Sequence, residues 1–246
     1  MAPEILRLER VYAGYDPELP IIKDITMRIE RGQFVSLVGS NGAGKSTLLK
    51  TIFGFLKPTS GRIFFDGADI TGIDPHGAKK IGIAYIPQDL SPFASMTVEE
   101  NLKMGFWLKR GDESLRDRLE EVYRVFPNLA QKRKMKASSL SGGEVKMLDI
   151  ARGLMIKPKL LLVDEPSVGL SPLMAEQIYK TLIKINSQEG ISVLLVDQNV
   201  KRAIEISEYT YYIENGEIRH HGPSEKIAEI AEKIVEATLM GDLIRL

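Results

Sequence analysis

The chain has 246 residues, which is enough for one large domain or for a core with an inserted subdomain. Its 33 Lys and Arg balance its 33 Asp and Glu, and this zero net charge argues against the broad basic surface of nucleic-acid-binding proteins. The absence of cysteine excludes disulfides, thiol catalysis and thiolate metal sites.

No apolar stretch approaches the ~18 residues needed to cross a bilayer, and the N-terminus lacks the apolar segment of a signal peptide. We therefore expect a cytoplasmic chain that is held at a membrane, if at all, by another subunit. The basic run at residues 132–136 is the one local departure from charge balance. It is typical of a solvated loop, with an anionic partner or a lipid head group as the alternative.

The first third of the chain predicts strands. Residues 5–11 and 25–29 alternate apolar and polar side chains, as half-buried strands do. Residues 34–38 form an apolar run before a glycine-rich loop, and residues 62–65 follow a Pro-Thr-Ser-Gly turn. This part of the chain therefore favours a β-rich beginning to an α/β fold.

The middle third predicts helices. The pattern is helical from residue 97 to residue 126, with a capped start at residues 97–101 and a charged amphipathic stretch at 113–126. A further helix is expected over residues 145–156.

The last third returns to strands. Residues 160–163 and 192–196 are short apolar runs typical of buried parallel strands, joined by a crossover helix at 172–187. Asn215-Gly216 is a two-residue hairpin signal between strands. Those strands are residues 209–213 and 217–219, and an amphipathic helix is expected over 224–239.

A phosphate-binding loop is predicted directly after the strand at 34–38. Residues 39–47 read Gly-Ser-Asn-Gly-Ala-Gly-Lys-Ser-Thr, a Gly-x4-Gly-Lys-Ser loop between a strand and a helix. Glycines let main-chain N–H groups approach phosphate oxygens, Lys45 adds a charge for the β- and γ-phosphates, and the Ser46 hydroxyl suits Mg²⁺. The predicted nucleotide contacts in this loop are Ser40, Asn41, Gly42, Ala43, Gly44, Lys45, Ser46 and Thr47.

Two carboxylates follow the apolar strand at residues 160–163. Asp164 can hold Mg²⁺ through water, and Glu165 can orient the water that attacks the γ-phosphate. Upstream, Ser141-Gly142-Gly143-Glu144 opens a helix. Its N–H groups, a hydroxyl and the helix dipole make a second anion site, although the segment read alone is a plain N-cap.

These segments together resemble the ATP-binding subunit of ABC transporters, over about residues 5–219. Residues 39–46 match the Walker A motif, 140–144 the signature motif and 160–165 the Walker B motif, in the family's order and spacing. The resemblance implies an α/β P-loop NTPase of the ABC ATPase fold. It has a RecA-like mixed-sheet core and an N-terminal antiparallel β subdomain. We expect one domain over 1–246, with the core at 1–87 and 158–246 and an inserted helical subdomain at 88–157.

The resemblance also implies roles that spacing alone does not give. Tyr15 would stack on adenine, and Gln88 would join Mg²⁺ and the γ-phosphate to the helical subdomain. Two such subunits pair head-to-tail, so the signature segment of one contacts the γ-phosphate held by Lys45 of the other. The predicted Mg²⁺ residues are Ser46, Gln88 and Asp164, and the predicted ATP contacts include Ser141, Gly142, Gly143 and Glu144.

One position departs from the common family pattern. Most members carry a histidine after the strand that corresponds to residues 193–196, whereas this chain has Asp197-Gln198-Asn199. An amide can donate a hydrogen bond to phosphate but carries no titratable proton. We therefore assign Gln198 to the catalytic residues as a hydrogen-bonding group, with Glu165 as the base.

Three features are together similar to the LivF-type subunit of branched-chain amino acid importers. They are Gln198, the Ser-x-Gly-Leu-x-Pro stretch after the Walker B motif, and Glu144. Residues 89–93 depart from the glycine- and arginine-bearing version of that type. This resemblance implies transmembrane permease partners, a place on the cytoplasmic face of the membrane and no contact with the transported molecule.

Two alternatives stay open, and a third class is disfavoured. A lipid or lipopolysaccharide exporter has similar compact ATPases. A soluble ABC ATPase of translation or DNA repair usually carries two cassettes or a long coiled-coil insertion, and this chain has neither. A P-loop kinase would need an acceptor site and a lid, and the segment at residues 141–143 argues against that class.

Overall fold

The computed structural model describes residues 3–89, 92–106 and 114–229. Within these ranges the chain forms two compact units, which we describe separately. Unit 1 comprises residues 1–75 and 192–246, and unit 2 comprises residues 76–191. The predicted helical insertion over residues 88–157 falls inside unit 2, and its boundaries stay a prediction.

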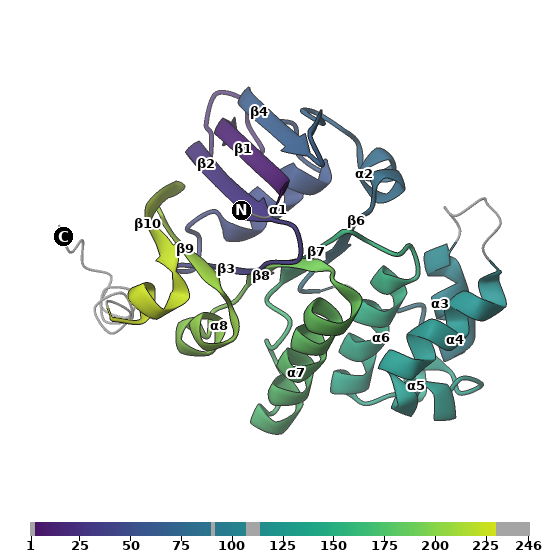
Figure 1. The fold of residues 1–246 in the computed structure, drawn as a ribbon. Coiled ribbons are helices and arrows are strands. Elements are labelled where there is room, and N and C mark those ends of the chain that lie inside the picture. Colours follow the sequence, from purple (N-terminus) through teal and green to yellow (C-terminus); the bar gives the residue numbers. More distant parts are fainter. Residues whose placement is uncertain (1–2, 90–91, 107–113, 230–246) are drawn as a thin grey trace. The chain divides into compact units, whose positions relative to one another are not determined.

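Unit 1 contains a four-stranded antiparallel sheet with the strand order β2-β1-β4-β5 (Figure 1). Its strands are β1 (Glu4–Ala13), β2 (Ile22–Glu30), β4 (Ser60–Phe65) and β5 (Ala68–Asp69). Apolar side chains at alternate positions of β1, such as Leu6 and Leu8, are fully buried. The strands that the sequence predicts at 5–11, 25–29 and 62–65 are confirmed.

A second, mixed sheet in unit 1 has the order β10-β9-β3-β8. Strand β3 (Phe34–Val38) lies in its interior and pairs in parallel with β8 (Ser192–Val196) and with β9 (Tyr209–Glu214). Strand β10 (Glu217–Pro223) returns antiparallel to β9. Every residue of β3 and β8 is buried, which explains why both read as continuous apolar runs.

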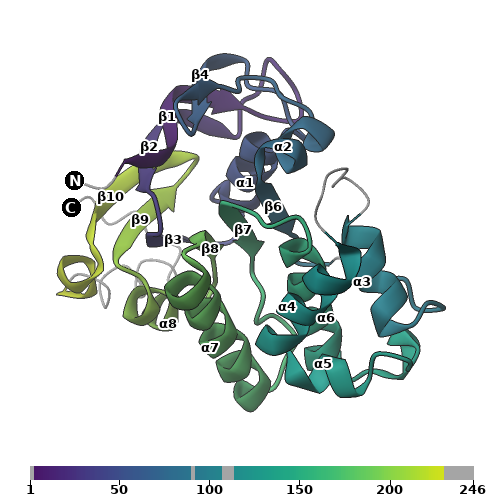
Figure 2. The same cartoon turned by 45° about the vertical axis from the view of Figure 1, so that its right-hand side comes forward.

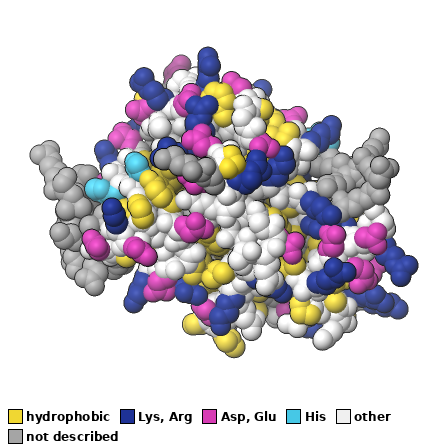
Figure 3. Space-filling model, viewed as in Figure 1, with side chains coloured by type: hydrophobic (Ala, Val, Ile, Leu, Met, Phe, Trp, Pro, Cys, Tyr) yellow, Lys and Arg dark blue, Asp and Glu magenta, His cyan; other side chains and the backbone are white. Residues whose placement is uncertain are grey.

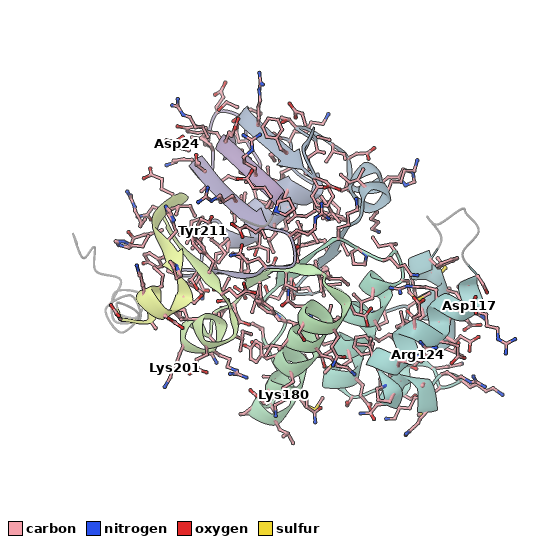
Figure 4. The ribbon with its side chains drawn as sticks, viewed as in Figure 1. Asp24, Asp117, Arg124, Lys180, Lys201 and Tyr211 are labelled. Carbon is pink, nitrogen blue, oxygen red and sulfur yellow. The ribbon has the colours of Figure 1, made fainter. Side chains whose placement is uncertain are left out.

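The hydroxyl of Tyr211 on β9 joins the two sheets of unit 1 (Figure 4). It accepts a hydrogen bond from the Arg28 N–H and donates one to the Arg28 carbonyl, each at 3.0 Å. Arg28 belongs to β2, the edge strand of the antiparallel sheet, so these bonds satisfy main-chain groups that no neighbouring strand reaches. Burial raises the pKa of Tyr211 to about 12, which keeps the hydroxyl protonated and able to donate.

Helices α1 (Lys45–Phe53) and α8 (Val200–Ile206) complete the regular structure of unit 1 before residue 224. In unit 2, β6 (Ile83–Ile86) pairs in parallel with β7 (Leu160–Asp164). The helices of this region are α2 (Pro75–Ile81), α3 (Val98–Phe106), α4 (Leu115–Val125), α5 (Pro127–Gln131), a 3-10 turn at Ala137–Ser139, α6 (Gly142–Leu154) and α7 (Pro172–Glu189). Figure 2 shows α3, α4, α5 and α6 gathered together, and α3 contacts both α4 and α6.

Most predicted helices are confirmed, with one corrected start. The pattern at 97–126 contains α3 and α4, although residues 107–113 lie outside the described ranges. The helix expected from residue 145 begins at Gly142, because the Ser141 side chain accepts a hydrogen bond from the Glu144 N–H and so caps it there. Of the helix expected at 224–239, residues 224–229 are helical and the remainder lies outside the described residues.

Charges of both signs are interspersed over the face drawn in Figure 3, in keeping with the zero net charge. Among the described residues, no helix is both long enough and apolar enough to span a bilayer.

Candidate functional site

The phosphate loop of unit 1 has the predicted strand–loop–helix geometry. Residues 39–44 connect the buried strand β3 to α1, which begins at Lys45. Gly42 has a φ of 79° and Gly44 a φ of 104°, and both values lie in the left-handed region that glycine adopts without strain. The main chain can therefore turn its N–H groups toward an anion at the start of α1.

Lys45 is held across this loop by main-chain oxygens. Its Nζ donates to the carbonyls of Gly39 and Ser40, each at 2.9 Å, and the side chain is only 4% exposed. Burying an ammonium without hydrogen-bonding partners would be costly, and these carbonyls reduce that cost. The loop is also closed by a bond from the Ala43 N–H to the Ser40 carbonyl at 3.2 Å.

The turn between β9 and β10 packs against the same loop. The Gly216 N–H donates to the Ala43 carbonyl at 3.0 Å, and the Gly216 carbonyl accepts from the Lys23 N–H at 2.7 Å. A Cβ on Gly216 would lie 1.9 Å from the Ile21 carbonyl oxygen. The sequence predicts this hairpin turn from Asn215-Gly216 but gives no sign that it supports the phosphate loop.

Tyr15 and Gln198 are the other predicted site residues of unit 1. Tyr15 is 64% exposed, and its hydroxyl accepts a hydrogen bond at 3.0 Å from Lys50 on α1. An exposed aromatic ring is thus attached to the helix that begins at the loop. Gln198 is exposed just beyond the end of β8, the neighbour of β3. Buried Asp197 accepts from the Asn199 N–H at 2.9 Å and so fixes the turn that carries Gln198.

In unit 2, Asp164 and Glu165 lie at the carboxyl end of β7 and are nearly buried, at 3% and 6% exposure. The Tyr85 hydroxyl donates to Asp164 Oδ2 at 3.1 Å and so orients that carboxylate. Glu165 has a φ of 44°, a left-handed conformation that is strained in a residue with a Cβ. Gln88 follows β6 just as Glu165 follows β7, because Ile86 and Val163 are register partners.

The donor set suits a hard divalent cation. A carboxylate oxygen of Asp164, a hydroxyl such as Ser46 and an amide oxygen such as Gln88 are the ligand types that Mg²⁺ prefers. The Tyr85 hydroxyl, which donates to the Oδ2 atom of Asp164, is the kind of second partner that metal-binding carboxylates usually have. The predicted residues therefore fit Mg²⁺ chemically.

The segment Ser141–Glu144 forms a capping box at the start of α6. Glu144 accepts from the Ser141 N–H at 3.0 Å, and Ser141 accepts from the Glu144 N–H at 3.4 Å. Lys132 donates to the other carboxylate oxygen of Glu144 at 2.5 Å. Lys132 and then the Ser141 N–H lower the pKa of Glu144, so it stays ionised. The N-cap interpretation is thus confirmed, and the role of this segment as an anion site stays a prediction.

The basic run at 132–136 is bonded to the rest of unit 2 through the Lys132 side chain and through main-chain oxygens, since the Arg133 and Met135 carbonyls accept from the Glu99 and Val98 N–H groups. Lys132 pairs with Glu144, while residues 133–136 are exposed, as the prediction of a solvated loop requires. Each unit contains a subset of the predicted site residues. Unit 1 holds the phosphate loop, Tyr15 and Gln198, and unit 2 holds Gln88, residues 141–144 and residues 164–165.

Replacing Gly216 with alanine tests whether the hairpin turn supports the phosphate loop. Both the φ of 83° and the approach of Ile21 oppose a Cβ, so the turn must shift and weaken its bond to Ala43. We expect ATP affinity to fall roughly ten-fold, equivalent to about 1.4 kcal/mol, by equilibrium titration with a nucleotide.

The matched control is Gly67→Ala. Gly67 has a similar φ of 80° in another hairpin turn, but a Cβ there would meet no atom within 4 Å. It should cost about 1–2 kcal/mol of stability for the left-handed conformation and leave ATP affinity unchanged. Wild-type affinity in a folded Gly216→Ala variant would contradict a supporting role for the turn.

Comparison with known proteins extends the likeness beyond the motifs. The model of the ABC transporter family matches residues 22–168, more than half of the chain. The branched-chain amino acid transport ATP-binding protein LivF of Archaeoglobus fulgidus is 41% identical over 92% of this chain and 94% of its own length. The high-affinity branched-chain amino acid transport ATP-binding protein BraG of Pseudomonas aeruginosa is 38% identical over 88% and 92%.

A lipopolysaccharide export ATP-binding protein, LptB of Acidithiobacillus ferridurans, is 31% identical over 97% of this chain and 98% of its own. Among solved structures, a nucleotide-free ATP-binding cassette from an ABC transporter has a TM-score of 0.84 and 29% identity, covering 95% of this chain and 98% of that one. A dimeric cassette in a post-hydrolysis state with ADP and phosphate has a TM-score of 0.77 and 27% identity, covering 89% and 99%.

The family match, the identities over nearly the full chain and the shared fold all point the same way as the three motifs. The α/β fold expected from the sequence is confirmed, with one antiparallel and one mixed sheet. The chain belongs to the ABC transporter family, as one of its ATP-hydrolysing cassettes.

Proposed function

We propose that this chain is the motor subunit of an ABC importer for branched-chain or related amino acids. The proposed class of transported substrate is supported by the similarity to two proteins named for branched-chain amino acid transport, across 92% and 88% of this chain. The observation that carries the motor activity is the loop at residues 39–47, with its buried Lys45 and left-handed glycines.

The proposed roles follow from the chemistry of each side chain. Lys45 neutralises charge on the β- and γ-phosphates, and the main-chain N–H groups of residues 40–47 bind phosphate oxygens. Tyr15 stacks on the adenine. Glu165 accepts a proton from the attacking water, and Gln198 donates a hydrogen bond to a γ-phosphate oxygen.

Mg²⁺, when bound, offsets charge on the phosphate oxygens as it does in other P-loop ATPases. We assign it to the hydroxyl of Ser46, the carboxylate of Asp164 and the amide of Gln88. Tyr85 keeps the Asp164 carboxylate oriented for this role through its 3.1 Å hydrogen bond.

The partners we propose are a second cassette and transmembrane permease subunits. A related cassette has been solved as a dimer with ADP and phosphate. In such a pair, residues 141–143 of one subunit, with Glu144 shaping the start of α6, would bind the γ-phosphate held by Lys45 of the other. The permeases would hold the chain on the cytoplasmic face of the membrane, and the transported amino acid would not touch it.

A second candidate is the ATPase of a lipopolysaccharide exporter. The specific observation in its favour is the 31% identity to LptB over 97% of this chain. The two candidates share the hydrolytic chemistry and differ in cargo and direction, so only a transport measurement separates them.

Uptake of labelled leucine, isoleucine and valine by the source organism tests the cargo. We expect deletion of the gene to lower this uptake, and the wild-type gene to restore it while a Glu165→Gln gene does not. Unchanged uptake together with loss of lipopolysaccharide from the cell surface would contradict the proposed import and favour the exporter.

Glu165→Gln and Lys45→Ala should separate hydrolysis from binding. The glutamine keeps the shape of the side chain but accepts no proton, so turnover should fall about 10²–10⁴-fold while ATP still binds. Lys45→Ala removes a charge from the phosphate site and should weaken ATP binding itself.

Steady-state hydrolysis beside equilibrium nucleotide binding measures both effects. The Glu165→Gln chain with ATP and Mg²⁺ should also give the largest dimer fraction in size-exclusion chromatography with light scattering, because ATP binding favours the closed pair. Near-normal turnover in Glu165→Gln would reject Glu165 as the base.

Gln198 should act as a hydrogen-bond donor without titrating. A hydrogen bond to a charged acceptor is worth about 1.5–3 kcal/mol. Gln198→Ala should therefore slow hydrolysis by roughly ten- to a hundred-fold. Gln198→His keeps a donor, so it should retain more activity and gain a pH dependence near pH ~6.5.

Rates from pH 6 to 8.5 for both variants check this assignment. The control is Asn199→Ala, because Asn199 is exposed beside Gln198 but accepts from the Arg202 N–H at 3.1 Å as the cap of α8. Its loss should lower stability and leave turnover near wild type. Wild-type turnover in Gln198→Ala would show that this side chain makes no contact with phosphate.

A further inference from the structure

Lys146 is a buried cation in unit 2 with no role in the motifs above. It lies on α6, four residues after Gly142, and is 8% exposed. Its Nζ donates to the main-chain carbonyl of Gln88 at 2.7 Å and to that of Pro87 at 3.2 Å. The helix that starts at the signature segment is thus bonded directly to the main chain at a predicted nucleotide-binding residue.

These carbonyls need a partner because of where they lie. Strand β6 ends at Ile86, so its parallel ladder with β7 stops before Pro87. Both bonds are partly buried, where a carbonyl without a partner costs free energy, and one ammonium can satisfy two carbonyls at once. Lys146 therefore satisfies the main chain at the point where it leaves the sheet.

The ammonium form of Lys146 is favoured by its two carbonyl partners, while the net effect of its surroundings is a lowered pKa. Burial lowers the pKa of this ammonium, whereas the carboxylates of Asp149, Asp89 and Asp164 act in the opposite sense. Asp149 follows one turn later on α6 and is itself paired with Arg152 at 3.1 Å. Two hydrogen bonds and nearby negative charge make the buried position tolerable.

The same segment is fixed again a few residues further on. Asn101 on α3 is fully buried, and its side chain accepts from the Phe93 N–H at 2.7 Å. It also donates to the carbonyls of Phe93, at 3.1 Å, and of Thr97, at 2.9 Å. Residues 90–91 lie outside the described ranges; before them the main chain is bonded to α6 at Gln88, and after them to α3 at Phe93.

We propose that Lys146 is a positioning residue for ATP hydrolysis, one that holds the main chain at Gln88 in a fixed relation to the signature helix. The role rests on the proposed function of Gln88, because Lys146 acts through that residue and touches no nucleotide. Loss of the two hydrogen bonds frees the main chain at Gln88, so the side chain of Gln88 loses its orientation while the phosphate loop of unit 1 is unaffected.

Lys146→Met tests the proposal, because methionine keeps an unbranched stem and removes the donors. We expect kcat to fall ten- to a hundred-fold, with ATP affinity within twofold of wild type. Lys146→Gln keeps an N–H donor on a shorter side chain, so its kcat should fall only three- to ten-fold, again without a change in affinity. Lys180→Met is the control, since Lys180 lies on the exposed side of α7 (Figure 4) and should leave both values unchanged.

A double-mutant cycle with Gln88→Ala distinguishes positioning from a general loss of structure. If Lys146 acts through Gln88, adding either Lys146 variant to Gln88→Ala should change kcat by less than twofold. Three results would each overturn the proposal. The first is a double variant in which the kcat losses of the two single variants multiply in full. The others are a fall in ATP affinity parallel to the fall in kcat, and wild-type kcat in Lys146→Met. Either Lys146 variant can be used in the cycle, so the test can still be done if one of them fails to fold.

The same assay separates this inference from the function on which it rests. It measures hydrolysis by the full chain and is independent of cargo, so a failed uptake experiment does not affect it. If Gln88→Ala alone has wild-type kcat, the assigned role of Gln88 is wrong and the role of Lys146 falls with it. If Gln88→Ala is impaired while Lys146→Met is not, only the inference about Lys146 is wrong.

Discussion

A buried ammonium bonded to the first main-chain carbonyls beyond a strand occurs in both units. In unit 1, Lys45 bonds Gly39 and Ser40 after β3, and in unit 2, Lys146 bonds Pro87 and Gln88 after β6. A main chain that leaves a buried parallel sheet presents carbonyls that no strand satisfies. In each case a lysine on a helix later in the chain donates hydrogen bonds to these carbonyls. The bonded segment contains residues that are predicted to bind phosphate or metal.

Glycine at position 216 illustrates how strongly such a loop depends on its surroundings. The phosphate loop is short and rich in glycine, so its shape comes from neighbours as much as from its own residues. Gly39 lies so close to the Ile213 carbonyl that a Cβ would approach its oxygen to 2.2 Å, and Gly216 bonds Ala43 from the adjoining turn. Strand β9 and its turn therefore support the loop that β3 delivers.

The features that the sequence alone predicts are those encoded by a few consecutive residues. The phosphate loop, the Asp164-Glu165 strand end and the Asn215-Gly216 turn are each contained in a few consecutive residues, and their elements are confirmed. Strand β6 is only four residues long, too short for periodicity to identify, and the contacts of Lys146 and Gly216 join residues far apart in the chain. Such contacts depend on tertiary packing, and no short pattern encodes them.

The buried face of α6 shows why one of these residues cannot be changed in isolation. Lys146, Asp149 and Arg152 are spaced by three residues and so share one side of the helix. Burial raises the pKa of Asp149 to about 6, against the opposing influence of Arg152 and Lys146. Removing one partner of a buried ion pair typically costs about 3–5 kcal/mol, because the remaining charge stays buried without compensation. Helix α6 is thus bonded to Gln88 from a face whose charges stabilise one another. A Lys146 variant therefore loses stability through these neighbouring charges as well, so its effect on Gln88 has to be measured by kcat and ATP affinity.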